Sequence, residues 1–264
     1  MNLADYKGVL VYIEQRDGEI QKVSLELLGK GKELAEKLGE KLSAVVLGHN
    51  IKALADELIY HGAEKVITVD HEVLKNFTNE PYTKALTAVI NNEKPAIVLV
   101  GATSIGRDIA PRVSARIHTG LTADCTSLDI DDETRNLMMT RPAFGGNIMA
   151  TIICPDHRPQ MSTVRPGVML KLERNTSNTG DVIDFDADLN AQDLNVEVLE
   201  IVKEDHKKVN IEDAKVLVSA GRGIGSKENM SPLYDLADEL KGEVSGSRAV
   251  IDNAWLDKDR QVGQ

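Results

Sequence analysis

Short apolar runs alternate with longer amphipathic stretches through the first part of the chain. The apolar runs have the length of buried strands, and the stretches between them carry apolar residues at helical spacing. The runs are Gly8–Ile13, Ser43–Gly48, Lys65–Val69 and Pro95–Gly101, and the helical stretches are Ser24–Leu42, Ile51–Tyr60 and Pro81–Asn91. Strands that alternate with helices of this length form βαβ units. The pattern predicts an α/β fold with a parallel sheet flanked by helices.

The alternation stops after a helix predicted over Ile109–Ile117. Strand-like segments then follow one another with no helix between them, and this order is typical of antiparallel pairing. They are Cys125–Ile130, Leu137–Pro142, Asn147–Cys154 and Ser162–Arg165. We therefore expect an antiparallel extension of the parallel sheet.

An acidic connector is predicted over residues 173–204, within which Asn195–Val202 has the pattern of a single strand. Little helical periodicity is found in this region, and the residues that follow it are polar and charged. Such composition is typical of the link between two domains. The predicted domains are therefore 1–204 and 205–264.

The second predicted domain opens with a strand over Lys215–Ala220, a glycine-rich turn over Gly221–Gly225 and, later, a strand over Glu243–Gly246. The helix between the strands is expected to begin with Ser231 as its N-cap and Pro232 at its first position. Two strands and one helix cannot bury a core of ordinary size. We therefore expect a truncated α/β domain, of which this chain carries the beginning.

Composition excludes several classes of partner. The 264 residues carry a net charge of −11, and aromatic residues make up 3%. Nucleic acid binding needs clustered Lys and Arg or stacking aromatic side chains, so no nucleic acid partner is expected. No apolar run approaches the roughly 18 residues of a membrane span, so no membrane partner is expected either. The two cysteines, Cys125 and Cys154, are far apart, which favours a reducing cytoplasm over a disulfide framework.

The turn Gly221–Gly225 (GRGIG) lies where a strand passes into helical structure, and backbone amides at such a place bind anions. Its spacing differs from the GxGxxG dinucleotide fingerprint, because the third glycine comes one position early and Ser226 follows it. An ordinary loop and a phosphate site are both compatible with this pattern. Arg222 favours the phosphate site, since a guanidinium beside exposed amides suits a pyrophosphate.

Ser247 and Arg248 follow the second strand of this domain. Ligands of open parallel sheets bind beyond the carboxyl ends of the strands, so Arg222 and Arg248 are expected to converge on one edge. The alternative is that Arg248 is a solvated or ion-paired arginine.

Several segments, in order and with matching spacing, resemble a known family. They are KVLVSAGRGIGSKENM, YDLADELKG and GSRAVIDNAWLDKDRQVGQ, preceded by LVGATSIGRDIAPRVSARIHTGLTADCT and TRPAFGGNIMATI. These motifs are similar to those of the α subunit of electron-transfer flavoproteins, over essentially the whole chain. The resemblance implies an electron carrier within an oxidoreductase complex rather than a stand-alone enzyme. It also implies a heterodimer, in which the first domain contacts a β subunit and the second holds FAD.

The resemblance further implies how individual residues contact the cofactor. The implied FAD contacts are Arg222 at the pyrophosphate, Ser247 and Arg248 against the isoalloxazine ring, and Val262, Gly263 and Gln264 in a flavin loop. A guanidinium beside the ring stabilises the negative charge of a reduced flavin and so raises its potential. The family pattern continues beyond Gln264 with a further FAD loop, so the site in this chain is expected to be partial.

The segments RPAFGGN and CPDHRPQMSTVRPGVM resemble the branch found in anaerobic fermenting bacteria, many of which bifurcate electrons. That branch implies that NADH reduces a second flavin near the β subunit. Electrons then divide between ferredoxin and the α-subunit FAD, which serves an acyl-CoA dehydrogenase-type flavoenzyme. A different hypothesis is a nucleotide-binding or scaffold subunit with no redox role of its own, which the parallel sheet of the first domain also permits.

Overall fold

The computed structural model describes residues 2–143, 148–202, 211 and 214–263. Contacts within the chain divide it into two units, Met1–Leu199 and Glu200–Gln264. The boundary predicted from the sequence, between 204 and 205, falls among residues 203–210, outside the described residues. That boundary therefore stays a prediction.

A sheet of parallel strands forms the centre of the first unit. Within the described residues its strands are β1 (Val9–Ile13), β4 (Leu42–Gly48), β5 (Lys65–Asp70), β6 (Ile97–Gly101), β7 (Leu121–Cys125), β11 (Gln160–Val164) and β12 (Asp181–Asp184). Their order across the sheet is β12-β5-β4-β1-β6-β11-β7, and every neighbouring pair is parallel. Every residue of β1 and β6 is buried, as expected for central strands of a sheet covered on both faces.

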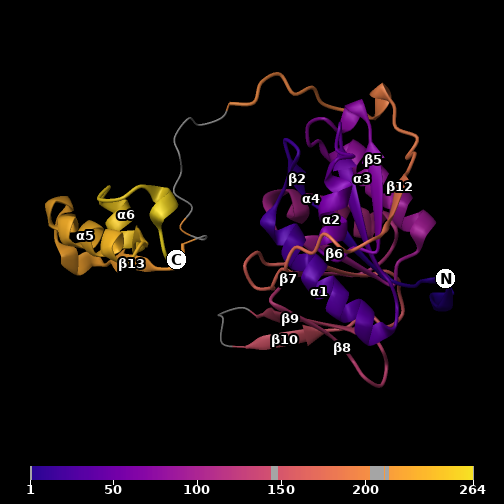
Figure 1. The fold of residues 1–264 in the computed structure, drawn as a ribbon, viewed down its shortest axis with the longest axis horizontal. Coiled ribbons are helices and arrows are strands. Elements are labelled where there is room, and N and C mark those ends of the chain that lie inside the picture. Colours follow the sequence, from indigo (N-terminus) through magenta and orange to yellow (C-terminus); the bar gives the residue numbers. More distant parts are fainter. Residues whose placement is uncertain (1, 144–147, 203–210, 212–213, 264) are drawn as a thin grey trace. The chain divides into compact units, whose positions relative to one another are not determined.

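Helices cover both faces of this sheet (Figure 1). They are α1 (Lys22–Leu38), α2 (Leu54–Tyr60), α3 (Asn79–Glu93) and α4 (Ser104–Arg116). The side chains of α1 and α2 share one apolar core with alternate residues of the strands, and those of α3 and α4 share the other. The predicted α/β fold with a parallel sheet flanked by helices is confirmed.

Local sequence determines where helix α1 ends and where helix α4 begins. The helix predicted to run to Leu42 ends at Leu38, because Gly39 adopts a left-handed φ of 65° and its amide bonds to the carbonyl groups of the last turn. Helix α4 starts earlier than predicted, because the Thr103 side chain caps it by accepting from the amide of Gly106 at 3.0 Å.

The antiparallel strands are confirmed in part. Strands β8 (Ser127–Ile130), β9 (Leu137–Pro142) and β10 (Met149–Ile152) form a separate antiparallel sheet in the order β10-β9-β8. The assignment of Ser162–Arg165 to this antiparallel group is wrong. This segment belongs to β11, which runs parallel between β6 and β7 at the end of the large sheet. Alternation of apolar residues identifies a strand but not the direction of its neighbour.

The connector contains a strand at a different place from the one predicted. Strand β12 pairs with β5 at the edge of the large sheet, and all four of its residues are exposed. The strand predicted over Asn195–Val202 is absent from the described structure, in which the segment has no regular secondary structure. Three of its apolar side chains, Val196, Leu199 and Val202, are 60–87% exposed.

Within its described residues, the second unit contains two parallel strands, β13 (Leu217–Ala220) and β14 (Glu243–Gly246), joined through helix α5 (Ser231–Glu239). Ser231 is the first residue of α5 rather than its N-cap, and the cap residue is Met230. The prediction for Ser231 is therefore wrong by one position. A short helix, α6 (Arg248–Asp252), follows β14.

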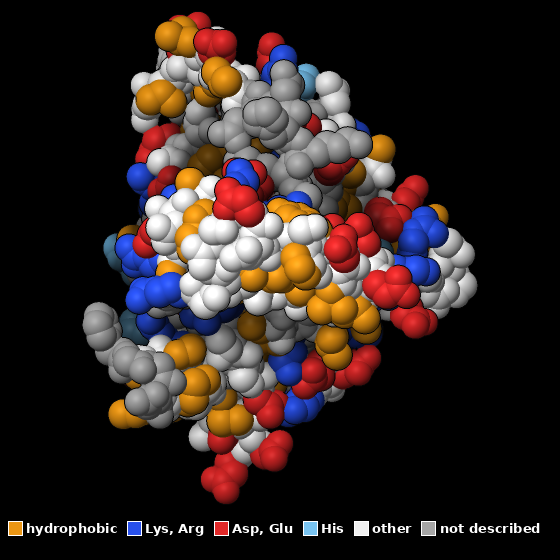
Figure 2. Space-filling model, turned by 90° about the vertical axis from the view of Figure 1, so that its left-hand side faces the viewer, with side chains coloured by type: hydrophobic (Ala, Val, Ile, Leu, Met, Phe, Trp, Pro, Cys, Tyr) orange, Lys and Arg blue, Asp and Glu red, His pale blue; other side chains and the backbone are white. Residues whose placement is uncertain are grey.

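Apolar side chains remain at the surface, where Figure 2 shows them mixed with acidic and basic ones. On the second unit the exposed large side chains include Leu217, Tyr234, Leu236 and Leu240, at 38–50% of their surface. The small core beneath them is built from Ala220, Met230, Ala237, Val244, Val250 and Leu256. Among the described residues, no helix combines the length and the apolar character that crossing a membrane requires.

Candidate functional site

Three segments of the second unit meet at the carboxyl end of its sheet. Ala220 and Gly246, the last residues of β13 and β14, lie opposite each other in the parallel register. The Ser247 amide donates to the Ala220 carbonyl at 2.9 Å, so the two following loops begin side by side. Gln261 forms a parallel bridge with Gly246, and the Val262 amide donates to the Gly246 carbonyl at 2.9 Å. The structure thus brings all three predicted site segments to one edge.

The glycine-rich turn has space beside its backbone. A β-carbon built on Gly221 or Gly223 meets nothing within 4 Å, and Gly221 has an ordinary φ of −107°. Neither packing nor a positive φ therefore explains the glycine at these two positions. Gly225 differs, because its φ of 81° favours glycine. Glycine without a packing reason leaves room for a ligand to approach the backbone closely.

Hydrogen-bond donors of the glycine-rich turn are also available to a ligand. The amides of Arg222 and Gly223 donate to no acceptor among the described residues. The first amides of a helical turn lack internal partners, and this turn begins at Arg222. The Arg222 side chain is exposed and forms no ion pair within the described part of the chain. This donor set suits an anionic group such as a pyrophosphate.

Ser247 and Arg248 lie at the start of α6. Ser247 occupies the N-cap position, but its side chain makes no capping bond there. The Arg248 side chain is 71% exposed, and its Nε lies 3.5 Å from a carboxylate oxygen of Asp252. An exposed pair of this kind is weak. Arg248 is thus ion-paired, as the alternative expected, and the pair is weak enough for the guanidinium to turn toward a ligand.

The third segment supplies Val262 and Gly263. Gly263 has a φ of 78°, and nothing lies within 4 Å of the place a β-carbon would take. The Gln261 side chain donates to the Gly263 carbonyl at 3.1 Å and closes this turn. Gln264, the sixth predicted contact, lies outside the described residues.

Two residues that hold these loops were not predicted. The Asn229 side-chain amide donates to the Ile224 carbonyl at 2.8 Å and fixes the end of the glycine turn. Arg260 donates to the Val244 carbonyl at 2.8 Å and to the Glu243 carboxylate at 3.3 Å. Both residues lie within segments that carry the family resemblance, but no spacing in those segments indicates which carbonyl each side chain binds.

The sheet of the first unit has its own site at which a ligand would be expected. Strand β1 lies between β4 and β6, so the strand order reverses at β1 and β6, where open sheets bind ligands beyond the strand ends. Here the buried Glu14 carboxylate accepts from the Thr103 hydroxyl and from Arg16 at 2.7 Å. A buried carboxylate at this point disfavours a phosphate.

Charged side chains also gather at the carboxyl ends of β7 and β11, on one side of the same sheet. Asp124 accepts from Arg165 at 2.7 Å and lies 3.4 Å from Arg107. The Arg165 hydrogen bond lowers the pKa of the Asp124 carboxyl, with Arg107 and Arg141 adding to the effect. Arg158 is held differently, by the backbone carbonyls of residues 154, 155 and 157, and burial lowers the pKa of its guanidinium.

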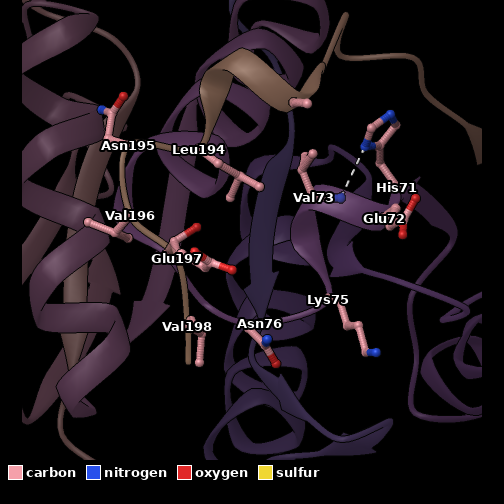
Figure 3. Close-up of a pocket in the computed structure, with 12 residues that line it drawn as sticks. His71, Glu72, Val73, Lys75, Asn76, Leu194, Asn195, Val196, Glu197 and Val198 are labelled. Carbon is pink, nitrogen blue, oxygen red and sulfur yellow. Dashed lines mark hydrogen bonds between the residues drawn. The ribbon is translucent and has the colours of Figure 1, made fainter. Parts of the chain in front are cut away.

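A pocket of about 720 Å³ also opens in the first unit, between the segment His71–Thr78 and residues 194–198. Figure 3 shows the side chains of Leu194, Val196 and Val198 on one side and Lys75 on the other, with the Val73 amide bonded to the His71 ring. None of the predicted site residues lines it. Across the described ranges, no cluster of three His, Cys, Asp or Glu side chains could hold a metal ion.

Comparison with known protein families agrees with the two units. Residues 9–190 match the electron transfer flavoprotein domain, and residues 210–264 match the electron transfer flavoprotein FAD-binding domain. The second match contains all three segments that meet at the edge of the small sheet.

Individual relatives extend the comparison. The chain is 56% identical to an electron transfer flavoprotein subunit alpha of Clostridium acetobutylicum, over 100% of this chain and 79% of that protein. It is 44% identical to an acryloyl-CoA reductase electron transfer subunit beta of Anaerotignum propionicum, over 100% of this chain and 79% of that protein. It is 40% identical to lactate dehydrogenase (NAD(+),ferredoxin) subunit LctC of Acetobacterium woodii, over 98% of this chain and 61% of that protein.

A match to both domains, together with the identity to relatives over the whole chain, settles the family. The cofactor follows from the second of the two domains. The chain belongs to the electron transfer flavoprotein α-subunit family, whose second domain binds FAD.

Proposed function

We propose that this chain is the FAD-holding subunit of an electron-transfer complex and that the edge of its small sheet is the flavin site. The observation that carries this proposal is the meeting of three loops at the Ala220–Gly246 pair, with open space at Gly221, Gly223 and Gly263. When bound, FAD supplies reversible uptake of one or two electrons.

The proposed contacts bind different parts of FAD. Arg222 and the free amides of its turn hold the pyrophosphate, because they combine a charge with unpartnered donors. Ser247 and Arg248 lie against the ring, where the guanidinium stabilises added negative charge. Val262 and Gly263 close the site from the third segment, and we assign Gln264 to the same contact from its position in the chain.

We further propose that the first domain, over residues 1–204, docks a β subunit to form a heterodimer. Support comes from β10, whose neighbourhood exposes Ile148, Met149, Ile152 and Ile153 at 39–65% of their surface. β10 lies at the end of its three-stranded sheet, with β9 on one side. An edge strand with exposed apolar side chains is a ready site for pairing with another chain.

The proposed reaction passes electrons between NADH, a β-subunit flavin and an acyl-CoA dehydrogenase-type partner, with ferredoxin as a second acceptor by bifurcation. Two relatives support this direction by name, one an electron transfer subunit of acryloyl-CoA reductase and the other a subunit of an NAD(+)- and ferredoxin-linked dehydrogenase. We place this reaction in the cytoplasm. The chain then acts as a carrier whose potential is set by its own residues.

The scaffold hypothesis has less support. It relied on a nucleotide site in the parallel sheet of the first unit, and the buried Glu14 carboxylate lies at the place where that site would form. A phosphate there would face a negative charge in a poorly solvated position.

The visible spectrum of the complex with its β subunit tests the proposed function. We expect bound flavin absorbance, reduction by dithionite, and reduction by NADH in a stoichiometry that counts the flavins. A complex that shows no flavin absorbance after reconstitution with FAD would contradict the cofactor role. Flavin that dithionite reduces but NADH does not would contradict the NADH-linked part alone.

A further inference from the structure

The outer edge of β14 carries two carbonyl groups that receive bonds from very different donors. In a strand, alternate residues direct their backbone groups to the same edge, so the carbonyls of Val244 and Gly246 both face away from β13. The Gly246 carbonyl accepts from the Val262 amide at 2.9 Å. The Val244 carbonyl, two residues earlier, accepts from the Arg260 guanidinium at 2.8 Å.

The Arg260 side chain takes the place of a missing ladder bond. If the pairing of Val262 with Gly246 continued backward, the Arg260 amide would donate to Val244. That amide is instead committed to the Asp257 carbonyl at 3.1 Å, within the helical turn Lys258–Arg260. Val244 is only 2% exposed, and an unpaired buried carbonyl is costly. A charge-assisted bond from the guanidinium removes this cost.

The same guanidinium is tied down from a second side. Its Nη1 also lies 3.3 Å from the Glu243 carboxylate, and the Arg260 side chain is 19% exposed, compared with 71% for Arg248. Arg260 is therefore a fixed part of the small sheet. Arg248, by contrast, is available to a ligand.

We infer that Arg260 is a positioning residue, which fixes Gln261 opposite Gly246 and thereby places Val262 and Gly263 beside Ser247 at the flavin site. Without it, the short third segment has one bridge to hold its register, and a slip of two residues along β14 would keep the same faces while displacing the loop. This inference rests on the proposed function for the identity of the ligand. The register itself is a property of the chain.

The test replaces Arg260 by methionine in the chain co-expressed with its β subunit. Lys258→Met is the matched control. It removes a cation from the same turn, and the Lys258 side chain has no partner within the described residues. Glu243→Gln removes the ion pair of Arg260 but leaves its hydrogen bond to the Val244 carbonyl. Arg260→Lys keeps a positively charged donor at position 260. We expect Arg260→Met to raise the FAD dissociation constant at least about tenfold and to change the visible circular dichroism of bound flavin. We expect Lys258→Met and Glu243→Gln to stay within about twofold of the wild type, and Arg260→Lys to recover part of the loss.

Amide hydrogen exchange supplies a readout that does not need flavin. The Val262 amide joins the third segment to β14 by donating to the Gly246 carbonyl, whereas the Ser247 amide joins β14 to β13 by donating to the Ala220 carbonyl. We expect Arg260→Met to speed exchange at Val262 while Ser247 stays protected. Equal loss of protection at both amides would show that Arg260 stabilises the small sheet as a whole rather than the register of the third segment, and would overturn the inference. Unchanged FAD affinity would also overturn it. If the wild-type complex binds no FAD, the proposed function fails, and exchange at Val262 alone decides the register.

Discussion

The amide of Val262 donates to the carbonyl oxygen of Gly246 at 2.9 Å, which adds a third segment to a sheet of two strands. This bond places the loop after Gln261 next to the loops that follow β13 and β14. Three motifs that are far apart in the sequence thereby share one edge.

Gly223→Ala should weaken FAD binding and leave the fold intact. A β-carbon at position 223 meets nothing within 4 Å among the described residues, so it would collide with a ligand bound there rather than with the protein around it. We expect a loss of affinity of at least about tenfold, measured by titration of the flavin-free complex with FAD. The unfolding midpoint should change by less than the equivalent of about 0.5 kcal/mol.

Gly246→Ala is the contrasting variant. A β-carbon there would lie 2.9 Å from Cγ1 of Val250 and 3.1 Å from Cδ1 of Leu256. This change should destabilise the second unit by about 1–3 kcal/mol through overpacking. If Gly223→Ala binds FAD as tightly as the wild type, the glycine turn is not the pyrophosphate site.

Arg248→Ala should lower the one-electron potential of the bound flavin. Removal of a cation beside the ring leaves the reduced form with less electrostatic stabilisation. We expect a shift on the order of 60 mV, the one-electron equivalent of about 1.4 kcal/mol, in a spectroscopic redox titration. Asp252→Asn serves as the control, since it frees Arg248 from its ion pair at 3.5 Å and should not lower the potential. An unchanged potential in Arg248→Ala would remove this residue from the role.

Ile152→Asn should weaken association with the β subunit. Ile152 is 39% exposed on β10, and burial of such a side chain in an interface would make the polar substitution costly. We expect at least about a tenfold rise in the dissociation constant of the heterodimer, measured by sedimentation. Val182→Asn on β12 is the control, because Val182 is 49% exposed on a different edge strand. Equal weakening by both variants would argue against a docking surface on β10.

The stability of the first unit should fall at acid pH in part through Asp124. The Arg165 hydrogen bond holds the pKa of this carboxyl below its ordinary value of about 3.9. A carboxyl with a lowered pKa in the folded state stabilises the fold above its unfolded pKa. That stabilisation is lost as the pH falls through the folded pKa.

Arg165→Met should therefore make the decline in stability below about pH 4 shallower. The pair is partly exposed, so the effect at neutral pH should be a few tenths to about 1 kcal/mol. Urea unfolding at about pH 6 and about pH 3 measures it. In a double-mutant cycle, Arg165→Met should change the free energy of unfolding little when it is added to the Asp124→Asn variant. An equal effect of Arg165→Met in both backgrounds would show that the arginine acts elsewhere.

Local sequence patterns predicted most elements but not their neighbours. The runs that became β1, β4 and β5 were predicted within one residue at each end, because buried strands need continuous apolar residues. The segment of β11 was recognised as a strand and assigned the wrong direction of pairing. Asn195–Val202 has the period of a strand and finds no partner within the described residues.

At the flavin site, too, the sequence predicted some residues and missed others. The motifs around Arg222, Ser247 and Val262 identified the family and its cofactor, since they keep a recognisable order and spacing. Arg260 and Asn229 lie within the same motifs but were not predicted as site residues, because nothing in the sequence indicates that their side chains bind the carbonyls of Val244 and Ile224.

The sequence by itself determined the alternation of strands and helices, the family, and the residue types available at the flavin site. Those properties depend on local periodicity and on motifs of fixed spacing. Only the tertiary structure decided that β11 runs parallel beside β6, that Glu14 lies at the centre of the large sheet's edge, and that Arg260 completes the edge of β14. Strand pairing and buried hydrogen bonds join residues that are distant in the chain, and no local pattern specifies which distant group each one will meet.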